Sequence, residues 1–393
     1  MSRYPVKDQV AFVGVGTTGF GGDMTGRSQL SLACEAATQA VGDAGLTARD
    51  IDGICGTFPP AYEMVSALGL PAVTHYGNQP PPVTFSVLDA MHAIFSGNCE
   101  TVLLYHSMFR TPYTSRAAAK DPFRKYLTLG DSTGVRNDPE QLGPPASYGV
   151  GYASWASRYM HEYGVGKEAF GYVTINSRTN ASRNPLAVRR DPITMEDYLG
   201  ARMVRDPLSM LDMDIPVDGA DAFVLTTAER ARDMPRRPVL INAATAGIVA
   251  RNEEDQTPSL RHHGQHVVVE DLRAKSDFRV PDVDLLFAYD GFTIITLQWL
   301  ESTGWCGPGE AGDFLLQHWD KEENRVLIDG RIPMNANGGS LGEGATQGSG
   351  MIREAIMQLR GNASDRQVPG AGNAFLTLGG FFFNAQGLVL RTD

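Results

Sequence analysis

The hydrophobic pattern of the chain alternates between short apolar runs and longer amphipathic segments. Residues 9–16 (QVAFVGVG) form a β-branched and aromatic run that ends in glycines, and residues 31–45 place apolar side chains at helical spacing. A strand over 51–58, a helix over 83–97 and a nearly continuous apolar strand over 100–108 follow. Such apolar runs are typical of strands that helices cover on both faces. The first hundred residues therefore predict an α/β unit.

The character of the sequence changes between about residues 109 and 192, which are rich in Pro, Gly, Arg and Tyr. This segment predicts two helices, over 152–163 and 167–183. We interpret it as a lid or loop insertion, because excursions between core elements commonly carry ligand-binding residues. The chain then returns to a buried strand over 218–227 and a short helix over 228–233.

The polar, proline-containing connector 233–238 separates two halves that are alike in kind. We predict an N-terminal half over 1–235, which includes the insertion, and a C-terminal half over 236–393. The second half predicts a strand, a strand-turn-helix unit, another strand, a Gly-rich loop leading into a helix, and a closing hairpin, over 239–250, 283–304, 325–330, 335–361 and 373–392. The likeness of the halves indicates an internal duplication without a residue-level repeat.

Composition narrows the class of protein. The chain has 393 residues, of which 42% are hydrophobic and 20% charged, as expected for a folded globular protein of two or three packed units. A net charge of -11 argues against a general nucleic-acid binder. Four cysteines without a CxxC motif favour neither a disulfide scaffold nor a structural zinc site. No signal-peptide run and no stretch of about 18 apolar residues occurs, so we expect a cytoplasmic protein.

Two polar clusters have alternative interpretations. Residues 178–190 carry four arginines, Arg178, Arg183, Arg189 and Arg190, which suit either the phosphates of a nucleotide-bearing cofactor or a solvated loop. His262, His263 and His266 lie in a segment that reads as a polar loop without an acidic ligand at suitable spacing, so no metal site is expected.

Six segments carry a family resemblance. In order and spacing, residues 152–164 (YASWASRYMHEYG), 176–187, 191–212, 218–231, 289–301 and 334–344 (MNANGGSLGEG) resemble the thiolase-like lipid-transfer proteins of the sterol-carrier-protein-x type. The resemblance covers essentially the whole chain. It implies a duplicated five-layered α-β-α-β-α thiolase fold, acyl-CoA thioester substrates, no metal, and no cofactor apart from the coenzyme A of the substrate.

The chain departs from the catalytic pattern of active thiolases. The nucleophilic cysteine of that family stands at the start of the helix over 83–97, where this chain has Pro80 to Pro82. The His of the second motif is replaced by Tyr289, the Gly-His-Pro turn by Gly342-Glu343-Gly344, and the Cys of the last Gly-rich turn is absent from residues 376–381. Cys55 and Cys99 lie elsewhere and are interpreted as packing residues. Thiolase acyl transfer is therefore not expected.

The Tyr-Asp pair resembles the Cys-less branch of the family, the steroid side-chain aldolases. That resemblance implies retro-aldol cleavage of a bulky β-hydroxyacyl-CoA to a ketone and a shorter acyl-CoA, without a covalent intermediate. It makes Tyr289 the candidate proton-transfer residue, with Asp290, Glu343 and Gln347 as candidate partners. The candidate substrate-binding residues are His106, Asn337, Gly338, Gly339, Gly379 and Gly380.

Several alternatives remain open at these positions. His106 either faces the site or is an ordinary hydrogen-bonded residue at a strand end, and the Gly379-Gly380 pair either cradles the thioester or only packs a hairpin. The aldolase branch has a second Tyr and a His in its Gly-rich loop, where this chain has Ala345 and Gln347. Tyr148 and Tyr152 of the insertion are alternatives to that second Tyr, or packing residues.

The resemblance also implies partners. Relatives are usually dimeric and often require a small accessory subunit with an OB-fold and a zinc ribbon, so a homodimer and a heterotetramer with such a subunit are expected. The alternative function is a noncatalytic acyl-CoA-binding or lipid-binding subunit of a larger complex. A condensing enzyme is a third, less favoured reading, because it requires a reactive active-site thiol.

Overall fold

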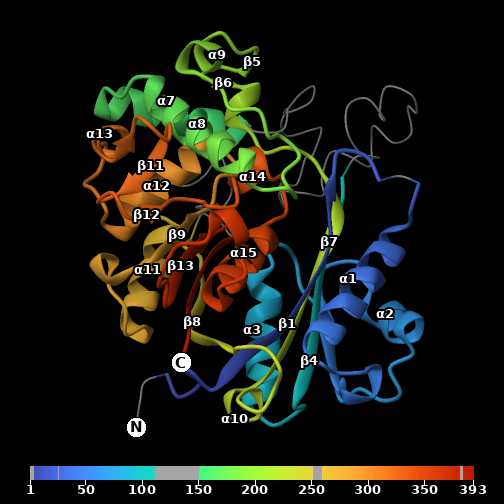
Figure 1. Ribbon diagram of the computed structural model, residues 1–393. Helices are drawn as coiled ribbons and strands as arrows, with labels where there is room; N and C mark the ends of the chain where they lie inside the picture. Colours follow the sequence, from blue (N-terminus) through green and yellow to red (C-terminus); the bar gives the residue numbers. More distant parts are fainter. Residues whose placement is uncertain (1–3, 25, 111–149, 251–258, 381–383) are drawn as a thin grey trace.

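A large mixed β-sheet organises the computed structural model, which describes residues 4–24, 26–110, 150–250, 259–380 and 384–393. Nine strands follow the order β3-β2-β4-β7-β1-β8-β14-β13-β9. Strand β1 (Val10–Gly21) pairs antiparallel with β7 (Asp218–Thr227) along most of its length and with β8 (Val239–Gly247) only at Ala11 and Phe12. This short contact joins the sheet of the first half to the sheet of the second half (Figure 1).

The first half has helices on both faces of its strands. Its remaining elements are β2 (Gly53–Gly56), β3 (His75–Asn78), β4 (Thr101–Phe109), α1 (Gln29–Asp43), α2 (Ala61–Leu68), α3 (Thr84–Phe95) and α10 (Ala228–Ala231). Along β4, Val102 and Leu104 pack in the core that contains α3, whereas Leu103 and Tyr105 pack in the core that contains α1 and α2. The continuous apolar run of β4 is explained by this burial on both faces.

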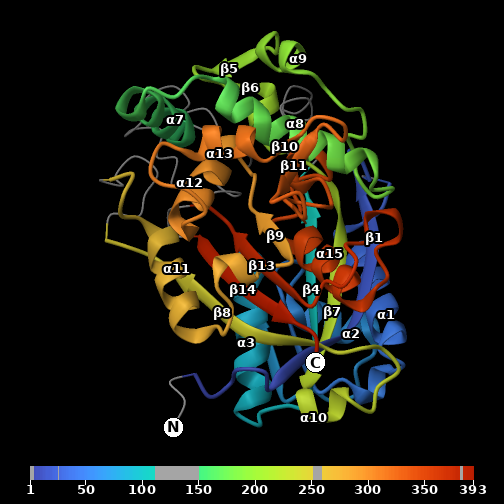
Figure 2. The ribbon, with the colours of Figure 1, turned by 60° about the vertical axis from the view of Figure 1, so that its left-hand side comes forward.

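The second half repeats this arrangement. It contains β9 (Leu285–Ala288), β13 (Asn373–Leu378), β14 (Ala385–Arg391), α11 (Gly264–Lys275), α12 (Thr293–Thr303) and α15 (Ser349–Arg360). Helices α3 and α15 lie between the two sheets, with α1 and α2 outside the first and α11 and α12 outside the second (Figures 1 and 2). The layers are therefore α-β-α-β-α, as the resemblance implied.

The insertion covers one end of the sheets. It contributes α7 (Val150–Tyr163) and α8 (Glu168–Ser182), and the elements that follow its predicted end are α9 (Met195–Leu199), β5 (Met203–Arg205) and β6 (Leu208–Ser209). This group of elements lies beside α13 (Ala311–Gln317), β10 (Trp319–Asp320), β11 (Arg325–Ile328), β12 (Ile332–Pro333) and α14 (Gly339–Gly342) (Figure 2). Short 3-10 turns occur at Ala48–Asp50, Met210–Asp212, Val280–Asp282 and Ser364–Arg366. Helix α8 is buried although it is polar, because Asn176 and Asn180 both donate to the Met334 carbonyl.

Most predicted elements are present in the structure, and the loop predicted for three histidines is confirmed only in part. His262 lies in the loop before α11 and His263 is the N-cap residue, but His266 lies within the first turn of the helix. Burial lowers the pKa of His263 to about 3, and its Nε2 lies 3.1 Å from the Gln298 side-chain oxygen. This contact links the start of α11 to α12. In the part of the chain that the structure describes, no helix has the length and apolarity needed to cross a membrane.

Candidate active site

Loops from both halves meet at the start of α3. The Val83 amide, one residue before the helix, donates to the Gln347 carbonyl at 3.2 Å. Gly379 has φ +70°, and a Cβ there would lie 3.1 Å from Pro82 Cγ, so the turn after β13 packs directly against the proline segment. Pro82, Gln347 and Gly379 therefore come together at the place where the family resemblance puts a nucleophilic cysteine.

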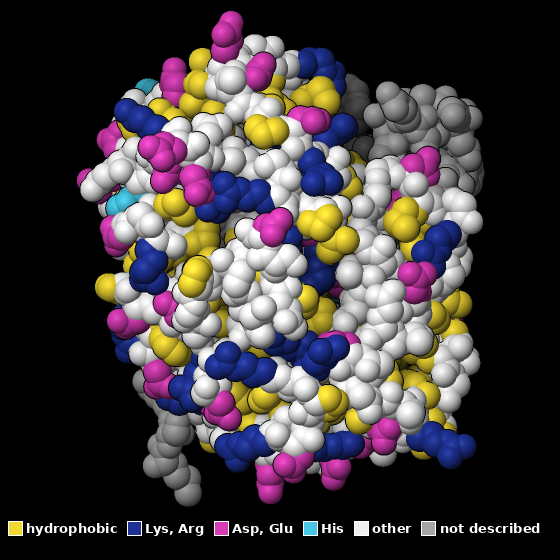
Figure 3. All heavy atoms as spheres, viewed as in Figure 1, with side chains coloured by type: hydrophobic (Ala, Val, Ile, Leu, Met, Phe, Trp, Pro, Cys, Tyr) yellow, Lys and Arg dark blue, Asp and Glu magenta, His cyan; other side chains and the backbone are white. Residues whose placement is uncertain are grey.

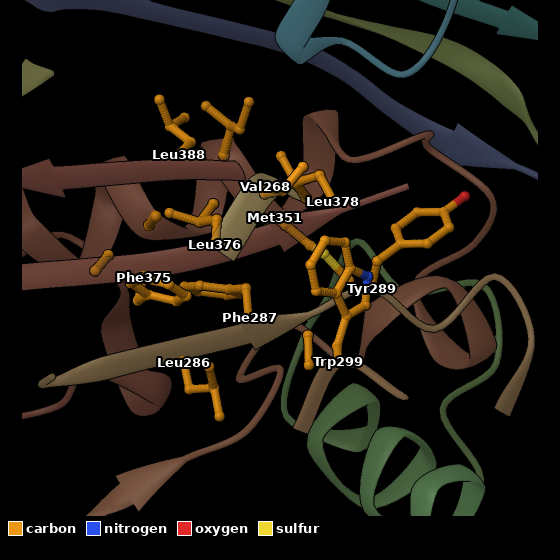
Figure 4. Close-up of a cluster of buried hydrophobic side chains, with 14 of the residues drawn as sticks. Val268, Leu286, Phe287, Tyr289, Trp299, Met351, Phe375, Leu376, Leu378 and Leu388 are labelled. Atoms are coloured by element: carbon orange, nitrogen blue, oxygen red, sulfur yellow. The ribbon is translucent and has the colours of Figure 1, made fainter. Parts of the chain in front are cut away.

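Tyr289 follows β9 directly and is only 4% exposed. Its amide donates to the Thr377 carbonyl at 3.0 Å, and its carbonyl accepts from Thr296 Oγ1 at 3.0 Å. Figure 4 shows its ring at the edge of the apolar cluster that includes Trp299 and Leu378, with the hydroxyl pointing away from those side chains. The backbone and the ring are fixed, so the direction of the hydroxyl is fixed as well.

Asp290 is fully buried and joins three elements. It accepts from the Ser340 amide at 2.6 Å, from Ser177 Oγ at 2.8 Å and from the Leu341 amide at 3.4 Å. Burial raises the pKa of Asp290 to about 6, although these donors lower it. The carboxylate thus ties the end of β9, which Tyr289 follows directly, to α8 and α14.

Glycine is required where the Gly-rich loop meets Asp290. Gly339 has φ +58°, and a Cβ there would lie 2.1 Å from Asp290 Oδ2. Gly338 precedes it at the N-cap of α14, and the Asn337 side-chain oxygen accepts from the Gly339 amide at 3.3 Å. Asn337, Gly338 and Gly339 therefore form one tight loop beside Asp290.

Glu343 belongs to a buried ionic network. Arg353 donates to both Glu343 and Asp221, Asn337 Nδ2 donates to Glu343 at 2.5 Å, and Asn184 Nδ2 donates to it at 3.3 Å. Burial raises the pKa of Glu343, and Arg353 opposes that rise. These contacts engage the carboxylate inside the protein and hold the Gly-rich loop in place.

His106 lies at the other end of this network. On β4 it is the register partner of Asp221 on β7, and its Nδ1 lies 3.1 Å from Thr57 Oγ1. Burial lowers the pKa of His106 to about 4, while Asp221 and the Thr346 backbone of the Gly-rich loop raise it. The imidazole is therefore neutral near pH 7 and lies next to the loop that carries Gln347.

Tyr152 of the insertion reaches the same region. Its ring stacks on Phe292 with centroids 4.1 Å apart, and a Cβ at Gly380 would lie 2.9 Å from its hydroxyl. The Gly380 amide donates to Asn384 Oδ1 at 3.2 Å, so this turn packs as a hairpin while it also borders the site. Tyr148, the other tyrosine considered, lies outside the described residues.

The cysteines behave as packing residues. Cys55 on β2 and Cys99 are both buried, and burial raises the pKa of each thiol, that of Cys99 to about 12. Neither thiol forms a thiolate near neutral pH. Sequence reasoning missed Ser177, Asn184, Asp221 and Arg353, although the Asn and Ser residues repeated at helical spacing over 176–184 are a signal that α8 has a polar partner.

The layered fold and the site together define a thiolase-fold protein that lacks the nucleophilic cysteine. The family described as "Thiolase C-terminal domain-like" matches residues 251–392. The chain is 36% identical, over 94% of its length and 96% of the relative's, to 17-hydroxy-3-oxo-4-pregnene-20-carboxyl-CoA lyase of Mycobacterium tuberculosis. It is 33% identical to the steroid side-chain-cleaving aldolase of Thermomonospora curvata, over 98% of both chains.

The chain is also similar to a solved structure of an aldolase. The structure titled "Ltp2-ChsH2(DUF35) aldolase" matches with a TM-score of 0.84 and 31% identity over 99% of both chains. A monomeric SCP2-thiolase-like protein of Mycobacterium smegmatis matches at 18% identity with a TM-score of 0.69, which supports the fold alone. The chain belongs to the thiolase-like family that contains the steroid side-chain-cleaving aldolases.

Proposed function

We propose that this protein is a carbon-carbon lyase that cleaves a bulky, steroid-derived β-hydroxyacyl-CoA into a ketone and a shorter acyl-CoA. The observation that carries the proposal is the proline segment Pro80 to Pro82 at the place of the thiolase nucleophile, in a chain that keeps the loops converging there. Full-length similarity to a CoA lyase and to a side-chain-cleaving aldolase supports the same reaction.

The proposed reaction needs no covalent intermediate. A base removes the proton of the β-hydroxyl group, the oxygen forms the ketone carbonyl, and the bond between the α and β carbons breaks. The electron pair of that bond passes to the thioester as an enolate, whose oxygen requires hydrogen-bond donors. Protonation at the α carbon then gives the shorter acyl-CoA, so atoms and charges balance without an added co-reactant.

Tyr289 is the proposed proton-transfer residue. Its hydroxyl is directed away from the apolar cluster, and Asp290 fixes the turn on which it stands (Figure 4). Gln347 is the proposed polar partner, because its backbone borders the start of α3 and its amide group both donates and accepts. Tyr152 is a candidate for a second hydroxyl at the same place, and Gly379 and Gly380 shape the surface that receives the thioester.

The test measures products and binding together. The chain, co-expressed with a DUF35 partner, is incubated with β-hydroxyacyl-CoA and β-ketoacyl-CoA esters and analysed by mass spectrometry. We expect ketone and shortened acyl-CoA from a hydroxy ester without free CoA. CoA-dependent cleavage of a keto ester would refute the aldolase, and ester binding without turnover would favour the noncatalytic acyl-CoA-binding subunit.

Tyr289→Phe tests the assigned residue. Loss of a general acid-base group lowers turnover about 10²- to 10⁴-fold. We expect that fall in kcat with ester affinity unchanged, whereas Tyr172→Phe, at a tyrosine of α8 whose ring packs on Trp319, leaves kcat unchanged. Unchanged turnover of Tyr289→Phe would remove Tyr289 from the mechanism.

The proposal includes a homodimer formed along β3. This strand lies at the edge of the nine-stranded sheet, and an unpaired edge is a template for pairing with a second chain. Tyr76 on β3 is 67% exposed and Tyr62 on the adjoining α2 is 65% exposed. A DUF35 subunit completes the proposed heterotetramer in the cytoplasm, where CoA esters are available. Light scattering of the chain alone and with its partner measures both masses.

A further inference from the structure

Arg178 is a buried cation on α8. It is 8% exposed and donates from Nη2 to the Asp191 carbonyl at 2.7 Å. Among the residues that the structure describes, its Nε has no hydrogen-bond partner and no carboxylate lies at ion-pair distance from its guanidinium. A solvated loop does not describe this residue, because most of its side chain is removed from water.

The charge of a second arginine, Arg189, affects the guanidinium of Arg178. Burial lowers the pKa of Arg178, and the positive charge of Arg189 lowers it further, while the exposed Asp191 opposes the shift. Arg189 is exposed and Arg178 is buried, so the charge that is removed from water is that of Arg178, and binding of an anion beside it would compensate that charge. The buried Arg178 and the nearby Arg189 therefore carry the charge that suits binding of an anion.

Neighbouring arginines differ from this pair. Arg183 and Arg325 both bind Glu323, and Arg366 binds Glu354, so these guanidinium groups have their counter-charges in the protein. Figure 3 shows several Lys and Arg side chains on the face over α8 and α14. Among the described arginines of residues 178–190, the one that is both buried and without a carboxylate is Arg178.

The pair lies beside the proposed active site. The Arg189 amide donates to the Gly342 carbonyl at 3.0 Å, and the preceding Val188 amide donates to the Glu343 carbonyl at 3.4 Å. One residue before Arg178, Ser177 donates to Asp290. Both arginines are thus attached to elements that hold the Gly-rich loop and the Tyr289 turn.

We propose that Arg178 and Arg189 bind a phosphate group of the coenzyme A portion of the substrate. The inference rests on the proposed function, which requires a CoA ester. A phosphate group offers negative charge and at least two terminal acceptor oxygens, and the planar guanidinium binds such a group in a bidentate manner. The chemistry is shared by the 3'-phosphate and the diphosphate of CoA.

The test measures binding, not turnover. Affinities of the chain with its co-expressed partner for CoA, dephospho-CoA and pantetheine are measured by calorimetry for the wild type, Arg178→Met and Arg189→Met. Charge-assisted hydrogen bonds correspond to about a 10- to 100-fold change in affinity. We expect that loss for CoA and no change for pantetheine. The exposed Arg190→Met, whose residue donates only to the Ser182 carbonyl, is the matched control with unchanged affinity.

Dephospho-CoA distinguishes the two phosphates. If the arginines bind the 3'-phosphate, the wild type and both variants bind dephospho-CoA with the same low affinity. If they bind the diphosphate, both substitutions still lower the affinity for dephospho-CoA. Unchanged CoA affinity in both variants, or an equal loss for pantetheine, would overturn the proposal. Arg189→Met keeps the test valid if Arg178→Met does not fold. Arginine-dependent CoA binding without aldol cleavage would leave this site in place and remove the proposed reaction.

Discussion

Replacing Arg353 by Met tests whether the buried network holds the Gly-rich loop. Arg353 lies between Asp221 and Glu343, and all three side chains are almost completely buried. Removing the cation leaves two carboxylates in a dry interior. Breaking a buried ion pair on one side costs about 3–5 kcal/mol, which is a large part of the stability of a domain. We expect the free energy of unfolding to fall by about that amount at pH 7.

The loss of unfolding free energy in Arg353→Met should depend on pH. Without Arg353 the folded-state pKa of Glu343, already raised by burial, rises further. A carboxyl group with a raised folded-state pKa favours folding while it is protonated, and that stability is lost as the pH rises through the folded-state pKa. The variant is therefore expected to be closest to the wild type at acidic pH and to fall behind it as the pH rises.

Urea denaturation at pH 5 and pH 7 measures both effects. Glu343→Gln keeps the Arg353–Asp221 pair and an amide oxygen for Asn337, so we expect a smaller loss of about 1–2 kcal/mol. Arg366→Met is the matched control, because it removes a guanidinium that pairs with one carboxylate, Glu354. Gln358 still donates a hydrogen bond to Glu354 in that variant. A loss in Arg353→Met that is no larger than in Arg366→Met, or that does not change with pH, would refute the network as the support of the loop.

Two further predictions concern the Asp290 junction. Burial raises the pKa of Asp290 from 3.8 to about 6. The protonated carboxyl group therefore contributes fully to the stability of the fold below pH 4, and this contribution is lost as the pH rises through 6. The pKa shift corresponds to about 3 kcal/mol of unfolding free energy. Asp290→Asn cannot ionise, and its unfolding free energy in urea should lose this pH dependence; a wild-type slope in the variant would contradict the assignment. Gly339→Ala should lower stability by at least about 2 kcal/mol in the same assay, since its Cβ would overlap Asp290 Oδ2 in a left-handed conformation; an unchanged midpoint would contradict it.

The repeating elements of the fold can be predicted because their patterns are local. The apolar run of β4 and the strand-turn-helix unit around Tyr289 appear at the predicted places. Strand β3 was missed, because HYGN is short, alternates between half-buried and exposed positions, and includes a glycine. Such a strand is defined by its pairing with β2, not by its own hydrophobicity.

The arrangement of the candidate site is less predictable from sequence. The Tyr289-Asp290 turn and the Gly-rich loop were found through their motifs, but the contacts that hold them come from distant residues. Arg353 reads as an ordinary charged position of an amphipathic helix, and only the tertiary fold places it between Asp221 and Glu343. The motif that makes Glu343 a candidate catalytic partner does not show that Arg353 engages its carboxylate, and its part in proton transfer stays a prediction.

The polar character of helix α8 affects the order in which segments of the chain fold during synthesis. Asn176, Ser177 and Asn180 find their partners at Asp290 and Met334, which are synthesised more than a hundred residues later. Contacts of such sequence separation form slowly, and a polar helix cannot become buried before its acceptors exist. A nascent chain that ends before Met334 should therefore leave α8 open to proteolysis even when the strands of the first half have already paired. We therefore expect α8 to be fixed in place only after Met334 has emerged from the ribosome.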